Sequence, residues 1–446
     1  MALTETLEEF ALAEMPRGAA APSRPTRQFS QRVRIAGSIA ALRAMRDEWE
    51  ALTAAAHEYS LASSYAYAEL AASLVFANGG VVAVATVHDG RDLHAIWPFA
   101  IGREGMLRVA RELTCGSNEE YGGPLIRGDA YPALLAAALA AAQRIRADVL
   151  EIRWLPHESR LRRALAAGVP ARRLTGAPKK SHPQPGYAIR MRDHPRWEDF
   201  AATLPHTLRA NLQRQHKRLG AKGRIEFGWC ATAADSEAVL RWLYANKRRW
   251  AETRGIDTSW LMDDQVRDFF IALAHRLDLS ETPLVAFAKL NDVPVAAAVM
   301  LVGPRAVEGL TTTYDETFRS YSVGGLLQEF LAKWTHAQGR DFDLRYLYSP
   351  YKAQWSNDET AYRKYAVFLT RRGRLVRESA ALAAALGRRG EKIAEQLSRR
   401  FRAAAPPAAN AAEARSASLS RYRAWSFSSR SNAPSSLRNS ETSFSR

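Results

Sequence analysis

Hydrophobic and polar residues alternate in two similar stretches, one in each half of the chain. The segment VVAVATVHDGRDLHAIWPFAI begins near residue 81, and PLVAFAKLNDVPVAAAVMLVG begins near residue 283. Each alternates on both sides of a short polar turn, at 88–90 in the first segment and at Asn291-Asp292 in the second. A period of two on both sides of such a turn predicts two antiparallel β-hairpins.

A helical pattern and a short strand motif follow each hairpin. Apolar residues recur with helical spacing over 131–145 and again over 324–338. Each helix is followed by the order apolar, acidic, apolar, Arg, aromatic, Leu, as LEIRWL at 150–155 and FDLRYL at 342–347. Two matches in the same order, each after a helix, predict a duplicated domain.

The repeat sets the domain organisation that we predict. Each copy reads as helices, antiparallel strands, a helix and a strand, which is an α/β unit with a mostly antiparallel central sheet flanked by helices. We place the copies at 31–185 and 186–376 and a further helix at 377–402. The strands predicted in the second copy are 284–290, 293–302, 306–314, 341–347 and 364–371.

The two ends of the chain have a composition typical of disorder. Residues 1–30 are rich in Ala, Pro and Arg, and residues 403–446 are rich in Ser, Arg, Ala and Pro. The tail is either a passive segment or a contact to a partner or to the inner face of a membrane. Its aromatic residues, such as Trp425 and Phe427, would make that contact.

Composition narrows the class of protein. The chain has 446 residues, 47% of them hydrophobic, which is enough for sizeable cores. The net charge of +17 suggests a nucleic-acid-binding protein. However, the segment from Arg371 onward has sixteen basic and five acidic residues, so +11 of this charge lies in that segment. Two distant cysteines indicate a reducing compartment. No signal peptide or membrane-spanning run is evident, so we predict a cytoplasmic protein.

The stretch RSYSVGGLLQEFL, at 319–331, opens the second predicted helix. Leu326, Leu327 and Leu331 form one apolar stripe, whereas Gln328 and Glu329 are expected to face away from it. A helix N-terminus carries free backbone N–H groups and the positive end of the dipole. Glycines let an anion approach those groups, and an arginine adds charge and two donors.

The same stretch resembles a cofactor loop of the GNAT acyltransferases. Arg319, Ser322 and Gly324 match the Arg/Gln-x-x-Gly-x-Gly/Ala loop, with Ser322 in place of the middle glycine. In that family the loop follows the fourth strand, opens a helix and binds the pyrophosphate of coenzyme A. The resemblance implies that Arg319, Tyr321, Ser322, Gly324 and Gly325 bind acetyl-CoA or another acyl-CoA.

A wider set of residues resembles the acetyltransferases of cellulose and exopolysaccharide synthesis, called CelD/BcsL-like. The resemblance covers roughly 35–375, and it is carried by TTYDETFRSYSVGGLL, DFDLRYLYSPYKAQW, HTLRANLQRQHKRL and NKRRW. Such proteins have two GNAT-like domains in tandem and are related to Fem-type peptidyl transferases. The family often has Pro where Val323 stands and a Gly-acid-acid segment where Leu347-Tyr348-Ser349 stands. The acids missing here are ones that could act as the base or contact the acceptor in that family.

The resemblance suggests residues for direct acyl transfer. A thioester must be positioned, the nucleophile must lose a proton, and the departing thiolate must gain one. Tyr351 is the candidate that protonates the thiolate, because a phenol of high pKa can donate a proton. Lys352 would bind an anionic acceptor group or a developing oxyanion, and Asp343 would act as the base. The structural alternatives are a half-buried tyrosine, a solvated lysine and an Asp343 ion pair.

Six further residues are predicted to bind the acceptor. Glu120 and Tyr121 lie in CGSNEEYGGPL, at 115–125, which lacks the arginine loop, so the first copy is expected to have lost its cofactor site. Arg209 and Arg214 belong to a basic stretch suited to a phosphorylated, nucleotide-linked or lipid-linked acceptor, or to a solvated helix face. The remaining two candidates are Asp315, which would otherwise cap a turn, and Trp355.

The function that we predict from sequence is acyl-CoA-dependent N- or O-acyl transfer. The acceptor would be a small molecule or glycan of an envelope or exopolysaccharide pathway. The histidines show no metal-ligand spacing and no Gly-x-x-x-x-Gly-Lys-Ser/Thr loop is present, so neither a metal nor a P-loop is predicted. The alternatives are a Fem-type transferase that uses charged tRNA, and a non-catalytic basic scaffold or nucleic-acid binder.

Overall fold

The computed structural model describes residues 29–117, 120–170, 173–176, 184–256, 259–376 and 378–379. The predicted tail at 403–446 and nearly all of the predicted helix at 377–402 lie outside these residues. The predicted disordered segment 1–30 ends too late, because Phe29 and Ser30 already belong to the first strand.

The first half comprises the described residues from 29 to 176. Its elements are β1 (Phe29–Ala36), α1 (Ile39–Arg43), α2 (Arg46–Ala55), the 3₁₀ helix η1 (Leu61–Ser63), α3 (Tyr65–Ala77), β2 (Val82–Asp89), β3 (Asp92–Glu104), β4 (Leu107–Glu112), β5 (Leu125–Ile126), α4 (Tyr131–Arg144), β6 (Val149–Pro156), α5 (Arg160–Gly168) and β7 (Leu174–Gly176).

The second half comprises the described residues from 184 to 379. Its elements are β8 (Gln184–Ile189), η2 (Met191–Asp193), α6 (Trp197–Thr203), α7 (His206–Gly220), β9 (Ile225–Trp229), α8 (Ala233–Thr253), α9 (Ser259–Met262), α10 (Gln265–Ala274), β10 (Val285–Leu290), β11 (Val293–Val302), β12 (Ala306–Tyr314), η3 (Glu316–Tyr321), α11 (Val323–Ala337), β13 (Asp341–Tyr346), α12 (Pro350–Trp355) and β14 (Asp358–Phe368).

The repeat predicted from sequence is present in both halves. The hairpins β2–β3 and β10–β11 are antiparallel, and each half then continues through a helix into a strand. Asn291 and Asp292 both have positive φ, 49° and 68°, as a two-residue hairpin turn requires. The predicted strand 364–371 is shifted, because β14 begins at Asp358.

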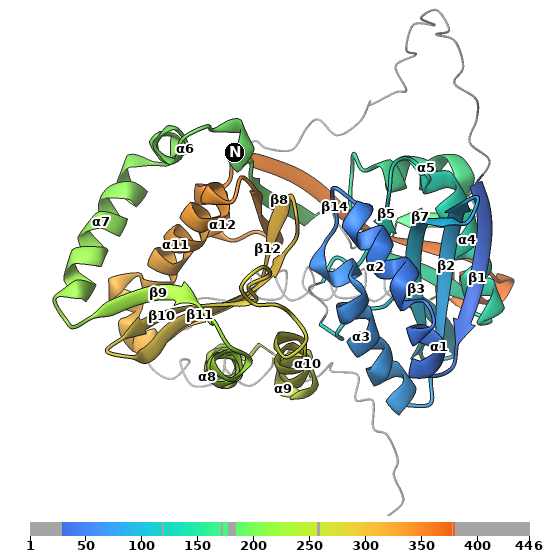
Figure 1. The fold of residues 1–446 in the computed structure, drawn as a ribbon, viewed down its shortest axis with the longest axis horizontal. Helices are drawn as coiled ribbons and strands as arrows, with labels where there is room; N and C mark the ends of the chain where they lie inside the picture. Colours follow the sequence, from blue (N-terminus) through green and yellow to red (C-terminus); the bar gives the residue numbers. More distant parts are fainter. Residues whose placement is uncertain are drawn as a thin grey trace, which may run out of the picture. The chain divides into compact units, whose positions relative to one another are not determined.

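One sheet runs through both halves, in the order β1-β2-β3-β4-β6-β14-β8-β13-β12-β11-β10-β9. Two short strands lie off this path, where β5 pairs with β3 and β7 pairs with β14. The β4–β6 and β12–β13 pairs are parallel, and every other pair is antiparallel. The fold is therefore the mixed α/β class that the sequence predicts, with a mostly antiparallel sheet flanked by helices (Figure 1).

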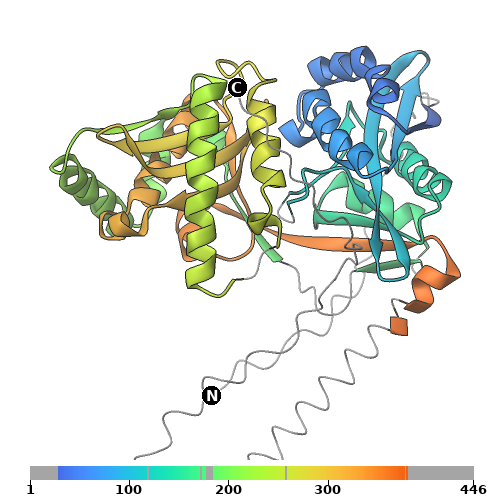
Figure 2. The same ribbon diagram turned by 90° about the horizontal axis from the view of Figure 1, so that it is seen from below.

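The two halves exchange strands at the middle of this sheet. Strand β14 pairs with β8 through its first residues and with β6 of the first half through its last. Strand β8, which follows the first half in the chain, pairs with β13 of the second. The long orange strand β14 passes from one half into the other in Figure 2. The domain limits at 185 and 186 stay a prediction, and strand β8 spans them.

The two faces of the second half carry different helices. Alternate residues of β11, such as Ala296 and Ala298, face α11, whereas Ala297 and Val299 face α8. Figure 2 shows α8, in yellow-green, crossing the yellow strands on one face of this sheet. The α8 face shares its core with the first half, where the Tyr67 ring of α3 lies 4.7 Å from Phe269 of α10. No helix in the described part of the chain is both long and apolar enough to cross a membrane.

Candidate functional site

The parallel strands β12 and β13 pair only over their first residues. The register runs from Ala306 opposite Asp341 to Glu308 opposite Asp343, although β12 continues to Tyr314. A bulge in β12 lies at this point, since the register with β11 shifts between Val299 and Met300. The two strands therefore diverge beyond Glu308.

A cavity of about 640 Å³ fills the space between the diverging strands. Its lining comes from α7, α8, β11, β12, η3, α11, β13 and α12, together with the turn after β13. The charged residues that line it are all cationic: Lys247, Arg319, Arg345 and Lys352. We infer that the cavity suits an anionic ligand.

The N-terminus of α11 opens into this cavity. Ser322 precedes the helix in a left-handed conformation, with φ 49° and ψ 38°, and its side chain makes no capping hydrogen bond. The first bond of the helix runs from the Leu326 N–H to the Ser322 carbonyl. The N–H groups of Val323, Gly324 and Gly325 therefore have no partner inside the helix.

The glycines at this helix start allow close packing. A Cβ at Gly324 would lie 3.1 Å from the Tyr314 ring, and one at Gly325 would lie 3.5 Å from Leu212 of α7. Neither glycine has a positive φ, so backbone conformation does not require glycine here. A side chain at position 324 would crowd the Tyr314 ring, whereas one at position 325 would make an ordinary contact.

Arg319 stands at the mouth of the cavity, on η3. Its side chain is 68% exposed, and its guanidinium lies 3.5 Å from Glu316. Tyr321, on the same element, packs under the Arg218 guanidinium of α7 at 5.0 Å. Four of the five predicted cofactor-binding residues line the cavity, and Tyr321 is the one that does not.

The turn from β13 into α12 forms another wall. Tyr351 is 45% exposed and lines the cavity, and the Lys352 Nζ donates to the Tyr346 carbonyl at 2.8 Å. Leu347 has a φ of 73°, a conformation that leucine rarely adopts. Trp355 also lines the cavity, but its 2% exposure makes it a core residue that anchors α12.

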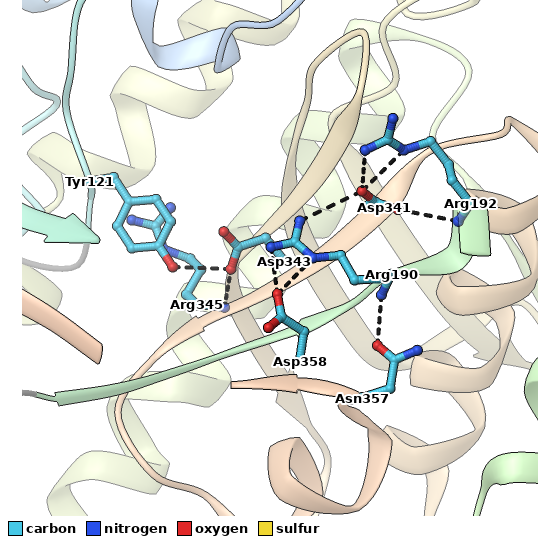
Figure 3. Close-up of polar contacts among 8 residues, drawn as sticks. All are labelled: Tyr121, Arg190, Arg192, Asp341, Asp343, Arg345, Asn357 and Asp358. Atoms are coloured by element: carbon cyan, nitrogen blue, oxygen red, sulfur yellow. Dashed lines mark hydrogen bonds and ion pairs between the residues drawn. The ribbon is translucent and has the colours of Figure 1, made fainter. Parts of the chain in front are cut away.

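Asp343 joins the two halves through Tyr121. The Tyr121 hydroxyl donates to Asp343 Oδ1 at 3.0 Å, and the Arg345 backbone N–H donates to the same oxygen at 2.6 Å. Figure 3 shows the second carboxylate oxygen pointing away from both donors. The Arg345 guanidinium lies 4.2 Å from the centroid of the Tyr121 ring, which also stacks on Tyr362 at 5.0 Å.

Two more buried carboxylates surround Arg345. Glu308 lies 3.4 Å from its Nη1, and Glu120 is 1% exposed. Glu120 Oε2 accepts from the Cys115 N–H at 2.9 Å, while Oε1 has no hydrogen-bond partner among the described residues. Glu120 is thus a buried member of this cluster, and it does not line the cavity.

Burial sets the pKa values of these acids. Desolvation raises the pKa of Glu120 to about 8, although the charge of Arg345 opposes the rise. Desolvation also raises the pKa of Asp343, against Arg345 and the Tyr121 hydroxyl. A carboxylate with a raised pKa is a stronger base, so Asp343 is suited to accept a proton.

A second group of ion pairs in Figure 3 holds the start of β13 in place. The Arg192 Nη2 donates to Asp341 at 2.6 Å, and the Arg190 Nε donates to Asp358 of β14 at 2.6 Å. The Arg190 backbone N–H donates to Asn357 at 2.8 Å. These contacts connect β8, β13 and β14, so their role is structural.

Of the six predicted acceptor-binding residues, only Trp355 lines the cavity; Glu120 and Tyr121 belong to the buried cluster around Arg345, and the other three lie elsewhere. Arg209 and Arg214 are on α7, whose other residues Leu208, Asn211 and Leu212 do line the cavity. Asp315 caps η3, where its carboxylate accepts from the Thr317 N–H at 2.9 Å. The geometry favours the capping role that the sequence left open for Asp315.

Sequence reasoning missed several residues of this site. Gln328 was expected to face away from the core, but it is 9% exposed and lines the cavity. Helical periodicity separates apolar from polar faces and does not show that a polar face covers a cavity. Thr311, Lys247 and Arg345 also line it. For Arg345, the available sequence signal was the arginine that recurs in the repeated strand motif at 150–155 and 342–347.

Comparisons with known proteins agree with this geometry. Residues 206–353 match a family model described as acetyltransferase (GNAT) domain. This range contains α7, η3, α11 and β13. The protein is therefore an enzyme of the acyltransferase class with a GNAT-type domain. No curated protein matched the sequence.

Among solved structures, that of FemX has a TM-score of 0.54 at 11% identity, and the match covers 74% of this chain and 98% of FemX. At this identity the likeness concerns the fold. A protein of unknown function from Bacteroides thetaiotaomicron VPI-5482 has a TM-score of 0.46 at 14% identity, over 73% of this chain and 97% of that one. A tandem GNAT protein from the clavulanic acid biosynthesis pathway has a TM-score of 0.40 at 11% identity, over 76% and 99%.

Proposed function

We propose that the protein transfers an acyl group directly from acyl-CoA, in the simplest case acetyl-CoA, to an amine or hydroxyl of a small-molecule or glycan acceptor. The sequence resemblance to CelD/BcsL-like proteins suggests an acceptor from an envelope or exopolysaccharide pathway. A GNAT-type domain supports acyl transfer in general, and the finer assignment rests on the cavity and its residues.

The observation that carries the proposal is the start of α11. Three backbone N–H groups without helical partners and the Arg319 side chain stand at a cavity to whose lining the described residues contribute no acidic side chain. Such an arrangement stabilises the negative charge of a pyrophosphate through hydrogen bonds and the helix dipole. The diverging edges of β12 and β13 leave room for an extended chain between them.

We assign three residues to proton transfer and charge stabilisation. Bound acyl-CoA supplies a thioester, which is activated toward nucleophiles. Asp343 is buried next to the cavity but does not line it, so its second carboxylate oxygen would accept the proton of the acceptor through a water molecule. Tyr351, at the cavity wall, would donate a proton to the departing CoA thiolate, and Lys352 would stabilise negative charge beside it.

The first test measures acyl-CoA binding to the full chain. Removing the Arg319 side chain deletes one charge-assisted contact, which is worth about 1.5–3 kcal/mol, so Arg319→Ala should raise the dissociation constant of acetyl-CoA by roughly tenfold or more. Isothermal titration calorimetry with acetyl-CoA and CoA checks this. Arg305→Ala is the control, because Arg305 is also an exposed arginine of this half and lies outside the cavity.

The second candidate is a Fem-type transferase that uses aminoacyl-tRNA. The fold likeness to FemX and the basic residues of α7 favour it. It predicts transfer that ribonuclease treatment abolishes and that acetyl-CoA does not support. Binding of acetyl-CoA that Arg319→Ala weakens, with activity retained after ribonuclease, would exclude this candidate.

A further inference from the structure

The cavity has a second end that the proposed acyl-CoA site leaves unused. Lys247 and Trp250, both on α8, line it, and the Lys247 Nζ donates to the Thr312 carbonyl at 3.0 Å. The ammonium also lies 5.6 Å from the centre of the Trp250 ring. These contacts hold the lysine beside the wall of the cavity.

This end lies on the opposite face of the sheet from α11. Helix α8 packs in the core with Val299 and Leu310, whereas α11 packs in the core with Met300 and Phe342. The cavity is lined from both cores, by Leu310 on one side and by Met300 and Phe342 on the other. It therefore passes between β12 and β13 and reaches both faces. If acyl-CoA occupies the α11 end, the acceptor approaches from the α8 end.

The charge at the α8 end is positive. The Arg254 guanidinium lies over the Trp250 ring, 4.8 Å from the ring centre. The acid beside Arg254 is Glu316, which lies 2.9 Å from its guanidinium. Arg254 and Glu316 neutralise one another, so the net positive charge at this end comes from Lys247.

A buried hydroxyl adds a directional contact. Thr311 lines the cavity at 5% exposure, and its Oγ1 has no hydrogen-bond partner among the described residues. Its neighbour Thr313 faces α8 and accepts a hydrogen bond from Asn246 at 3.2 Å, so Thr311, two residues earlier on the strand, faces α8 too. A buried hydroxyl of this kind gains a partner when a polar ligand enters.

We propose that the acceptor substrate carries an anionic group, a phosphate or a carboxylate, which binds at the α8 end of the cavity to Lys247 and Thr311. The proposal rests on the acyl-transferase function proposed above. Lys247 supplies the charge, and the Thr311 hydroxyl supplies a hydrogen bond. The nucleophile of the acceptor then lies deeper in the cavity, toward the point where β12 and β13 diverge.

The test titrates inorganic phosphate, and separately succinate, into the full-length protein that is already saturated with CoA. Calorimetry should show binding at one site, and the better of the two anions identifies the group. Lys247→Gln removes the charge but keeps a donor for the Thr312 carbonyl, so the protein should fold. The variant should weaken anion binding about tenfold and leave the CoA dissociation constant unchanged. Lys289→Gln is the matched control, because Lys289 is a lysine of the same half outside the cavity.

Three outcomes would overturn the proposal: no anion binding to the CoA-saturated protein, anion binding that CoA abolishes, or equal binding by wild type and Lys247→Gln. Absence of CoA binding would instead overturn the acyl-CoA proposal. In that case the same anion titrations into the CoA-free protein decide between the two ends. Loss of anion binding in Lys247→Gln supports the α8 site. Loss of anion binding only in Arg319→Ala contradicts it.

Discussion

At the scale of single residues, the contact between Tyr121 and Asp343 is the one that gives the first half a place in the proposed chemistry. Tyr121 comes from the copy that lacks the arginine loop, yet its hydroxyl holds the Asp343 carboxylate at 3.0 Å. The ring of Tyr121 is fixed in turn by Arg345 and Tyr362. We infer that Tyr121 is a positioning residue for the base.

Tyr121→Phe should slow release of CoA from acetyl-CoA about tenfold, because a hydrogen bond to a charged group contributes about 1.5 kcal/mol or more. The tyrosine hydroxyl lowers the pKa of Asp343, so its removal should move the acidic limb of the pH–rate profile to higher pH. Acetyl-CoA affinity should not change. A rate loss in Tyr121→Phe without a shift of this limb would indicate a merely structural role, and Tyr131→Phe on α4 is the control.

Glu120 makes stability depend on pH. Its pKa rises from 4.5 to about 8 on folding, so the folded state holds a proton that the unfolded state releases between these values. The unfolded state then binds fewer protons, and the free energy of unfolding falls as pH rises through this window. Glu120→Gln keeps the acceptor for the Cys115 N–H and should remove up to about 1.4 kcal/mol per pH unit of that slope. Urea unfolding between pH 5 and pH 8 checks this, and an unchanged slope would contradict it.

At the scale of elements, β8 and β14 connect the two halves, and one glycine allows their side chains to fit. A Cβ at Gly186 of β8 would lie 2.1 Å from the Tyr362 ring of β14. The same ring stacks on Tyr121, so it has little freedom to move aside. The strand exchange and the position of Tyr121 therefore depend on this small residue.

Gly186→Ala should lower the free energy of unfolding by about 1–3 kcal/mol, the usual cost of overpacking. Gly220→Ala is the matched control, because no atom lies within 4 Å of a Cβ built there on α7. That substitution should leave stability unchanged or raise it by up to about 1 kcal/mol. Equal effects of the two substitutions in thermal or urea unfolding would show that the Tyr362 contact is unimportant.

At the scale of the whole molecule, the two copies share one sheet and one core. Strand β14 needs β6 of the first half, and α8 and α10 pack in the same hydrophobic cluster as α3. The cavity walls come from the second half, but the Asp343 carboxylate depends on Tyr121 from the first. We therefore expect the two copies to fold as one cooperative unit.

A fragment of residues 186–376 should therefore unfold at a lower temperature than the full chain, and its acetyl-CoA binding should be lost or strongly reduced. The physical reason is the exposed apolar face of α8 and α10 and the unpaired end of β14. Circular dichroism melts of the fragment and of the full chain check this. A fragment with the stability and affinity of the full chain would show that the second copy is an independent domain.

Much of the local structure follows from the sequence by itself. The alternation around Asn291-Asp292 and the apolar stripe after Ser322 predict β10–β11 and α11, because turn chemistry and side-chain periodicity act over a few residues. The free N–H groups at the start of α11 follow from the same pattern, and so does the candidate anion loop at Arg319.

Only the tertiary structure decided which of these residues meet. Tyr121 and Asp343 are far apart in the chain, and their contact depends on the order β6-β14-β8-β13. The same strand order determines three further features: the burial of Gln328 in the cavity wall, the core position of Trp355 and the position of Lys247 at the second end of the cavity. Periodicity cannot show such contacts, because strand order and the faces that meet are set by packing across the whole sheet.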